Sequence, residues 1–492
     1  MRYRSYVVRL QVIMTTIILL IFVLFLISGA GNAETIKPFT TPLPVPPILE
    51  NLDTESGSAH FRLAVQQGSR SFFPGMNTNT FGYNGNFLGP TIRVRNGQKI
   101  KIDVINTLKE NTTVHWHGLH VPAKWDGGPR QVIEAGESWH PEFTIRQPAA
   151  TLWYHPHGMG LTGEQVYMGL AGLFIIEDEV SENLALPKTY GFDDFPLIIQ
   201  DRRFFEDGSF AYVQGMMDAM HGVIGNHLMV NGVIDPNLDV PKGLIRLRLL
   251  NGSNSSIYHI RFADNRSFHQ IATDGGFQEN PVLLTSLLLS AGERSEIVID
   301  FGNDKAGSTL KLIVTQNPGY QFEAMQFTVI DTQTKGAKLP DQLTAIDWMK
   351  ESKTVKTRRF VMETMSMGGA PMRMGMAPRR LTINGKNMDI GRIDEQVKLG
   401  TTEIWEITNS SRMMMQLPHS MHLHDVQFQI LDRNGIQPPP EEKGRKDTIL
   451  ILPGERVRII SRFADYTGVY MYHCHVLEHE DKGMMGQFEV ID

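Results

Sequence analysis

Histidine is the residue whose spacing first indicates chemistry in this chain. Ten of its 17 histidines fall into four short groups, each of which contains a His-x-His pair. The groups are His115-Trp116-His117, His155-Pro156-His157, His419-Ser420-Met421-His422-Leu423-His424, and His473-Cys474-His475 followed by His479. On a β-strand, residues i and i+2 share a face, so each pair would present two imidazoles side by side. Four such pairs can enclose a cluster of metal ions.

The only cysteine, Cys474, lies between two of these histidines. If its two neighbours face the metal cluster, Cys474 must point to the opposite side of its strand. There it can meet His479, Met484 and, from the third group, His419. Two histidines, a cysteine thiolate and a weak axial methionine form the blue-copper electron-transfer site. An electron that arrives at Cys474 would therefore have a through-bond route to the cluster.

The histidines have two other interpretations, as structural or chance pairs and as zinc ligands. A single His-x-His pair is weak evidence, because such pairs also occur as structural or chance features. Zinc is bound by similar imidazoles. Neither interpretation accounts for four groups together with the Cys–His–Met spacing, so the pattern favours copper.

With these motifs the sequence resembles the multicopper oxidases, especially the bacterial three-domain branch of laccases, cuprous oxidases and bilirubin oxidases. The resemblance covers nearly the whole chain after the N-terminal segment. It implies an oxidoreductase that takes single electrons from a reducing substrate and passes them to dioxygen. It also implies four coppers per chain: one type 1, one type 2 and two type 3. Ser420 stands where the family usually has proline, which leaves the ligand spacing intact.

The family's ligand roles carry over to matching positions in this sequence. The type 1 (blue) copper would be bound by His419, Cys474, His479 and Met484. The type 2 copper would be bound by His115 and His422. The type 3 pair would be bound by His117, His155, His157, His424, His473 and His475. The retention of this whole set disfavours relatives that keep the fold and lose the copper.

Reduction of dioxygen to two waters consumes protons, and histidines bound to copper cannot supply them, so nearby carboxylates are expected. Asp126, in Trp125-Asp126-Gly127-Gly128, and Glu480, next to His479, match family positions. We expect both to be catalytic as proton donors, with Cys474 as the electron-accepting residue. Either acid could instead be a solvated loop residue or orient a ligand histidine. Glu478 is expected to be structural.

Methionines cluster at 216–220, at 362–376 and at 413–415. Thioethers are soft ligands suited to Cu(I), and they are also flexible core fillers. The 362–376 stretch is rich in glycine and proline, which favours an exposed loop. Its role, and the natural reducing substrate, stay open at this point.

The elements that must hold these residues are β-strands. Runs rich in β-branched residues at 91–94, 99–104, 244–250, 297–299 and 457–460 are bounded by Gly, Asn or Pro. A turn motif recurs three times along the chain, as Ala135-Gly136-Glu137, Ala291-Gly292-Glu293 and Pro453-Gly454-Glu455. We predict an all-β protein of three cupredoxin-like Greek-key β-sandwich domains. They span 50–180, 190–335 (without copper ligands) and 355–492 (with the blue copper).

The N-terminus, residues 1–33, has the pattern of a signal peptide, with basic residues before an apolar core. The alternative is an N-terminal membrane anchor, since its apolar run could span a bilayer. We expect an exported protein, periplasmic or extracellular, with no stable membrane insertion if the signal is cleaved. A net charge of −6 shows no basic excess of the kind that binds nucleic acid.

The expected partners are O2 and a small reducing substrate. A laccase-like enzyme would oxidise phenols, aromatic amines or metal ions. The alternative is a dedicated cuprous oxidase for copper tolerance. A non-catalytic copper-binding envelope protein is less favoured, because it would not need the complete ligand set.

Overall fold

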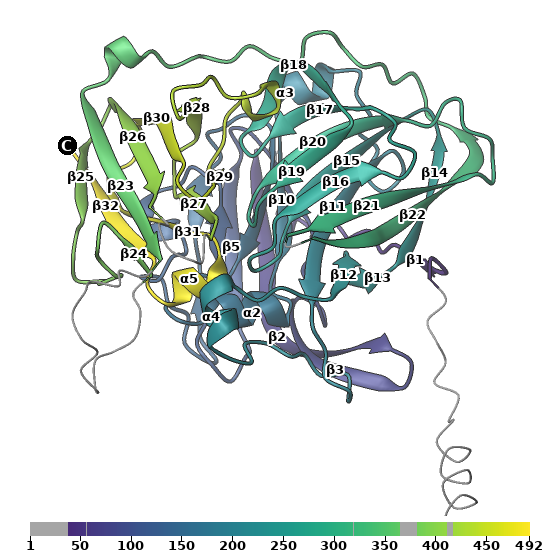
Figure 1. The fold of residues 1–492 in the computed structure, drawn as a ribbon, viewed down its shortest axis with the longest axis horizontal. Coiled ribbons are helices and arrows are strands. Elements are labelled where there is room, and N and C mark those ends of the chain that lie inside the picture. The colour runs from purple at the N-terminus through teal and green to yellow at the C-terminus, as the bar shows by residue number, and fades with distance from the viewer. Residues whose placement is uncertain (1–37, 56, 318, 365–380, 411–416) are drawn as a thin grey trace, which may run out of the picture.

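The computed structural model describes residues 38–55, 57–317, 319–364, 381–410 and 417–492. The predictions for segments 1–33, 365–376 and 413–415 concern residues that lie outside the described ranges. Strands dominate the described chain and its helices are short (Figure 1), which confirms the all-β prediction. In the figure the third unit lies at the left and the second at the right, with strands of the first unit between and below them.

The first unit is a sandwich of two sheets that share one core. One sheet runs in the order β3 (Met76–Tyr83), β2 (Ser58–Phe73), β5 (Lys99–Asn106) and β7 (Ser138–Trp139), with β8 (Glu142–Thr144) paired to β5. The other runs β4 (Ile92–Arg95), β10 (Gly172–Glu177), β9 (Ala150–His155) and β6 (His115–His117). Ile100, Ile102 and Val104 of β5 are buried in the core while the residues between them are not, as a half-buried strand requires.

The second unit has the same two-layer form. One sheet runs β13 (Val233–Ile234), β12 (His227–Val230), β11 (Asp194–Arg202), β15 (Leu244–Asn251), β20 (Arg294–Asp300), β17 (Phe268–Thr273) and β18 (Gly276–Leu284). The other runs β1 (Thr41–Pro42), β14 (Pro236–Lys242), β22 (Tyr320–Gln333), β21 (Thr309–Gln316), β16 (Tyr258–Phe262) and β19 (Ser286–Leu289). Strand β1 precedes the first unit in the chain but pairs with β14 of the second unit. The proline-rich segment that leads into the first unit therefore begins on the second unit.

The third unit completes the set. One sheet runs β24 (Leu381–Ile383), β23 (Lys356–Thr364), β26 (Thr401–Asn409), β30 (Arg456–Phe463) and β28 (Phe428–Arg433). The other runs β25 (Glu395–Lys398), β32 (Met485–Ile491), β31 (Gly468–Cys474), β27 (His419–Leu423) and β29 (Thr448–Ile451). Met362 is a fully buried core residue of β23, so the first methionine of the 362–376 stretch belongs to the sandwich and not to an exposed loop.

Short helices fill the connections. They are α2 (Thr162–Met168), α3 (Glu179–Asn183), α4 (Met216–His221) and α5 (Leu477–Asp481), with 3-10 turns η1 (Ala123–Trp125), η2 (Glu351–Lys353) and η3 (Pro440–Glu442). Helices α2, α4 and α5 come from different units and lie together at the lower centre of Figure 1. Across the described ranges, no helix combines the length and apolar character needed to cross a membrane.

The recurring turn motif has one backbone conformation in all three units. Gly136, Gly292 and Gly454 have φ of 85°, 87° and 78°. This is the left-handed region, which glycine enters without steric cost. In the second and third units the motif joins β19 to β20 and β29 to β30, respectively. The domain boundaries stay predictions, but this repeat supports three related units.

Candidate metal centre

Strand register brings the histidine groups together in pairs. In the first unit, antiparallel pairing of β6 with β9 places His115 opposite His155. In the third unit, pairing of β27 with β31 places His422 opposite His473. Side chains of directly opposed residues lie on one face, within about 5.5 Å at Cβ. Each end unit therefore presents a patch of imidazoles, and the two patches face each other where the units meet.

All ten histidines of the groups are at most 1% exposed, and Cys474 and Met484 are fully buried. Burial lowers the pKa of His115 and His475 to about 3, and that of His479 to about 4. These imidazoles are therefore neutral in the folded protein near neutral pH, which is the state that binds a metal ion.

His157, His424 and His473 form the tightest group. Their Nε2 atoms form a triangle with sides of 3.0 Å (His157–His473), 3.1 Å (His157–His424) and 3.2 Å (His424–His473). One histidine comes from the first unit and two come from the third. Nitrogens at these separations can share one ion at the usual metal–imidazole distance of about 2 Å.

The remaining histidines form two overlapping groups beside this triangle. One contains His117, His155 and His475, and the other contains His115, His117 and His422. In each group the ring nitrogens lie within 4.8 Å of one another. His117 and His155 approach to 3.3 Å, between Nδ1 and Nε2. The rings of His117 and His422, from opposite units, stack with centroids 3.7 Å apart.

Hydrogen bonds to main-chain carbonyls show where the protons lie. His115 Nδ1 donates to Asp126 O (2.8 Å), His422 Nδ1 to Asp447 O (2.8 Å) and His155 Nδ1 to Pro156 O (2.8 Å). A carbonyl can only accept, so the Nε2 atom of each neutral ring carries a bare lone pair. Among the described residues, Nε2 of His115 and of His422 has no hydrogen-bond partner. Buried lone pairs that converge without donors call for a cation, and the donor set fits copper.

A separate group surrounds Cys474. Its Sγ lies 3.4 Å from His419 Nδ1 and 3.6 Å from His479 Nδ1. His479 Nε2 donates to Met220 O at 2.7 Å, which leaves Nδ1 bare toward the sulfur. Met484 is buried in the same cluster, and its main chain is hydrogen-bonded to both Cys474 and His479. Burial raises the pKa of Cys474 to about 12, so a bound cation is needed to keep the thiolate at neutral pH.

The two predicted proton donors lie against histidines of the candidate metal centre. Glu480 Oε1 and Oε2 are 3.3 Å from His157 Nδ1 and 3.1 Å from His473 Nδ1. Asp126 Oδ2 accepts from His424 Nδ1 at 2.7 Å. Burial, with a contribution from Asp425, raises the pKa of Asp126 well above its ordinary value. For Glu480 burial acts the same way, but the two neighbouring histidines outweigh it and its pKa is lowered.

Glu478 lies in the same helix but contacts other groups. Its carboxylate accepts hydrogen bonds from Asn254 Nδ2 (2.8 Å) and from the Val223 amide (3.2 Å), both in the second unit. Burial raises its pKa to about 7. These contacts join α5 to the second unit, which agrees with a structural role.

Sequence reasoning missed several residues that hold the ligands. Thr364 Oγ1 lies 3.0 Å from His419 Nε2, and the Asp447 carboxylate lies 3.1 Å from His117 Nε2. Asp447 could not be identified from the sequence because it belongs to no ligand-spaced motif and contacts His117 only in the folded chain. Of the methionines at 216–220, Met220 lies beside His479, because its main-chain oxygen accepts a hydrogen bond from His479 Nε2.

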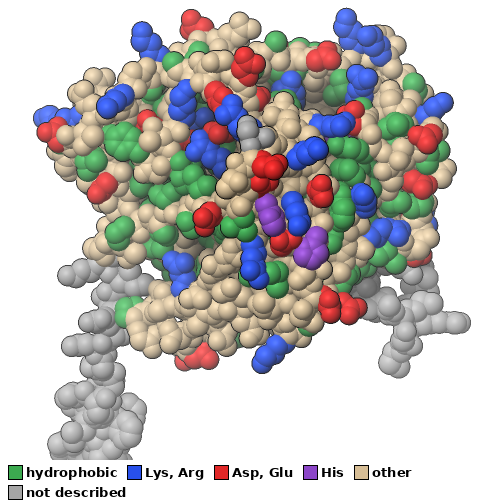
Figure 2. All heavy atoms as spheres, turned by 180° about the vertical axis from the view of Figure 1, so that it is seen from behind, with side chains coloured by type: hydrophobic (Ala, Val, Ile, Leu, Met, Phe, Trp, Pro, Cys, Tyr) green, Lys and Arg blue, Asp and Glu red, His purple; other side chains and the backbone are tan. Residues whose placement is uncertain are grey.

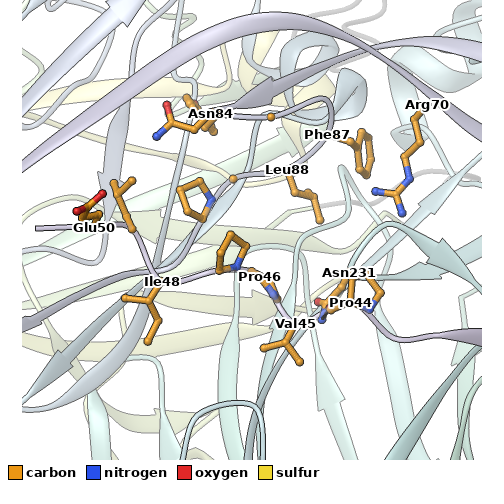
Figure 3. Close-up of a pocket in the computed structure, with 16 residues that line it drawn as sticks. Pro44, Val45, Pro46, Ile48, Glu50, Arg70, Asn84, Phe87, Leu88 and Asn231 are labelled. Carbon is orange, nitrogen blue, oxygen red and sulfur yellow. Dashed lines mark hydrogen bonds between the residues drawn. The ribbon is translucent and has the colours of Figure 1, made fainter.

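A cavity of about 300 Å³ lies elsewhere, between the lead-in residues 44–50 and the segment 84–90 (Figure 3). Arg70 and Phe87 lie side by side at one end of it and Glu50 lies at the other. No histidine lines it. The face in Figure 2 carries acidic and basic side chains interspersed, with histidines among them near its middle. The candidate metal centre is thus an internal site that is distinct from this cavity.

Comparisons with known proteins agree with the geometry. Residues 64–181 and 356–492 match two family models that are both described as multicopper oxidase. A multicopper oxidase of Staphylococcus haemolyticus is 40% identical over 445 residues, covering 90% of this chain and 91% of the relative. The cell division protein FtsP of Escherichia coli is 37% identical over 478 residues, 94% of each chain.

Solved structures give the same result. A laccase-like multicopper oxidase, CueO, from Ochrobactrum sp. is 41% identical, with a TM-score of 0.83, and covers 92% of this chain and 100% of its own. A laccase from Pediococcus acidilactici is 35% identical, also with a TM-score of 0.83, over 93% of this chain and 96% of its own. These similarities confirm the prediction of cupredoxin-like sandwiches.

The buried histidines predict how the metal-free protein responds to acid. His115 and His475 have pKa values of about 3 in the fold against 6.5 for a free histidine, so between these values the unfolded state binds more protons. The free energy of unfolding should therefore fall as the pH drops from about 6.5 toward 3. Urea unfolding of chelator-treated protein across this range measures it. His115→Gln should reduce the slope, and a pH-independent midpoint would contradict the reasoning.

The group around Cys474 predicts a colour. Copper-loaded protein should contain about four coppers per chain and show a strong blue thiolate-to-copper absorption. Cys474→Ser should remove the absorption and about one copper while the histidine groups keep theirs. Metal analysis and visible spectra of both proteins test this. A wild type that is colourless and yet fully loaded with copper would rule out the assignment.

Proposed function

The chain belongs to the multicopper oxidase family and is an oxidoreductase, and on this premise we propose that it couples one-electron oxidation of a small reducing substrate to the four-electron reduction of O2 to water. Four coppers would be held by twelve side chains. The type 1 ion would be held by His419, Cys474, His479 and Met484, and the type 2 ion by His115 and His422. The type 3 pair would be held by His117, His155, His157, His424, His473 and His475.

One observation carries the proposal: adjacent residues of a single segment reach different ligand groups. Cys474 lies against His419 and His479, while its two chain neighbours belong to the other groups. His473 lies in the triangle with His157, and His475 lies with His155. Copper, when bound, supplies one-electron redox chemistry at both places. The peptide bonds on either side of Cys474 provide a short covalent connection between them.

The chain's own acids would supply protons. Asp126, which burial keeps protonated to a higher pH than an ordinary aspartate, would hold a proton on the carboxyl group whose Oδ2 lies 2.7 Å from His424 Nδ1. The Glu480 carboxylate lies 3.3 Å from His157 Nδ1 and 3.1 Å from His473 Nδ1, so its charge would act on both rings. In this position it can also pass protons into the centre. Both roles need a carboxyl that is close to a ligand but not itself a ligand.

Helix α4 carries exposed methionines beside the Cys474 group, and these bear on the choice of substrate. Met216 and Met217 are 61% and 58% exposed, and Met220 of the same helix accepts the hydrogen bond of His479. Thioethers at this surface can bind Cu(I). The acid on the helix, Asp218, is already paired with Arg203 at 2.7 Å, which weakens its attraction for a cation. We therefore propose oxidation of phenols or aromatic amines together with non-exclusive oxidation of Cu(I).

Two other functions are distinguishable. A dedicated cuprous oxidase would oxidise Cu(I) and fail on phenols; against this, the similar Ochrobactrum enzyme is described as active toward lignin model compounds. The other alternative is a non-catalytic envelope protein, and the observation in its favour is the similarity to a cell division protein. The convergence of bare, buried imidazole nitrogens favours the enzyme, because a scaffold gains nothing from it. Oxygen uptake with a phenol, an aromatic amine and Cu(I) separates all three.

We further propose that the protein is exported, to the periplasm or the extracellular space. The support is the signal-peptide pattern of residues 1–33, with basic residues before an apolar core. Comparison of the mature N-terminus with the encoded one tests whether this segment is cleaved.

Glu480→Gln should leave the blue absorption intact but slow reoxidation of the fully reduced enzyme by O2. A glutamine preserves the shape and can still accept a hydrogen bond, but it cannot carry a proton, and general acid catalysis is worth roughly 10²-fold or more. Stopped-flow reoxidation measures the rate. Glu478→Gln, in the same helix, is the matched control and should reoxidise like the wild type. An unchanged rate in Glu480→Gln would leave it a structural acid.

Replacing both Met216 and Met217 by Leu should lower kcat/KM for Cu(I) by roughly tenfold, the effect of about 1.4 kcal/mol of lost binding. The rate with a phenol should change much less, because leucine keeps the apolar surface. Met76→Leu, an exposed methionine on another element, is the control. Deletion of 365–376 should act in the same direction. If Cu(I) and phenol rates fall equally, or neither changes, the methionines do not handle copper.

A further inference from the structure

The second unit reaches into the metal centre through one turn, Ser290 to Arg294, which contains the recurring Ala-Gly-Glu motif. Arg294, the first residue of β20, is 1% exposed. Its Nη1 donates to Asp447 Oδ1 at 2.7 Å and its Nη2 to Asp447 Oδ2 at 2.6 Å. Such a two-point contact between a planar guanidinium and a carboxylate fixes both position and rotation of the carboxylate.

Asp447 in turn holds a histidine from each end unit. Its Oδ1 lies 3.1 Å from His117 Nε2, and its main-chain oxygen accepts from His422 Nδ1 at 2.8 Å. These bonds place the proton of His117 on Nε2 and that of His422 on Nδ1, so the opposite nitrogen of each ring is free for a metal ion. The rings of His117 and His422 stack with centroids 3.7 Å apart, so Asp447 holds both members of a stacked pair, His117 through its carboxylate and His422 through its main-chain oxygen.

Arg294 also makes contacts in all three units. Its Nε donates to Thr151 O of the first unit at 3.2 Å, and its other donors reach Gly292 O at 3.0 Å and Asp274 O at 3.2 Å within the second. The bond to Asp447 reaches the third. One side chain therefore ties the second unit to both ligand-bearing units at the level of the imidazoles.

The chain is shaped to admit this contact. Gly118, next to His117, has φ of 86°, and a Cβ placed there would lie 2.6 Å from Asp447 Oδ2 and 2.7 Å from Arg294 Nη2. Only glycine leaves room for the ion pair. On the other side of the turn, a Cβ on Gly292 would stand 3.0 Å from the His475 ring. Ser420, between ligand histidines, lies 2.9 Å from both Ser290 Oγ and Ala291 O.

We propose that Arg294 is a positioning residue for the three-copper cluster: it holds Asp447, whose carboxylate sets the tautomer of His117 and whose main-chain oxygen sets that of His422. This rests on the proposed function and extends it, because it gives the second unit, which contributes no residue to the ligand groups of the described chain, a part in building the site. Lysine cannot replace arginine here, since an ammonium group cannot bond both carboxylate oxygens in one plane.

The test compares Arg294→Lys with a matched control, Arg248→Lys. Arg248 is also buried in the second unit and makes a two-point contact with Asp194, at 2.8 and 2.8 Å. Unlike Arg294, it is not bonded to a carboxylate that holds one of the grouped histidines. Asp447→Asn, which keeps the shape, serves if Arg294→Lys does not fold. The readouts are copper per chain after dialysis against a chelator, blue absorption, the electron paramagnetic resonance spectrum of type 2 copper, and the urea midpoint.

Both lysine variants should lose stability to a similar degree. Only Arg294→Lys and Asp447→Asn should bind cluster copper more weakly, by about 10- to 100-fold, with an altered type 2 spectrum and unchanged blue absorption. Unchanged cluster copper in these variants, or an equal loss in Arg248→Lys, would overturn the inference and leave the proposed function standing. A wild type that never binds cluster copper would instead overturn the proposed function.

Discussion

The constraint on which this structure depends is the convergence of unprotonated imidazole nitrogens in the buried interior. Buried polar atoms are normally satisfied by hydrogen bonds, and lone pairs directed at one another repel. In rings such as those of His115 and His422, the outer nitrogen donates to a main-chain carbonyl, so the inner nitrogen is left bare. The scaffold must therefore be rigid enough to hold a polar arrangement that is favourable only around cations.

The β-sandwich meets this demand because its side chains alternate with a period of two. In β6 the middle residue, Trp116, enters the core of the first unit while the histidines on either side leave it. In β31 the same alternation sends Cys474 to the core of the third unit, where His419 and His479 meet it. A helix could not divide neighbouring residues between two sites in this way. The architecture and the chemistry follow from one backbone geometry.

Much of this was predictable from the sequence, since it depends on local spacing. The strand at 244–250 and the turn glycines followed from composition and period, and the His-x-His pairs implied a shared face. What could not be predicted depends on contacts between distant segments. Arg294 and Asp447 lie 153 positions apart and have no motif, so only the packing of the second unit against the third brings them together. The methionine run misled in part because Met362 is indistinguishable by type from its neighbours and yet lies in a strand.

The distance along the chain between the two halves of the cluster has a consequence for biogenesis. His157 and His424 face each other across 267 positions, so the two halves of the candidate centre come from distant parts of the chain. Closing so long a loop has an entropic cost, and it cannot begin before the third unit has been synthesised. Copper could therefore be captured at the proposed cluster only after the first and third units have docked. Metal loading would then act as a check on assembly, because a chain whose first and third units have not docked presents the histidines of only one unit at a time.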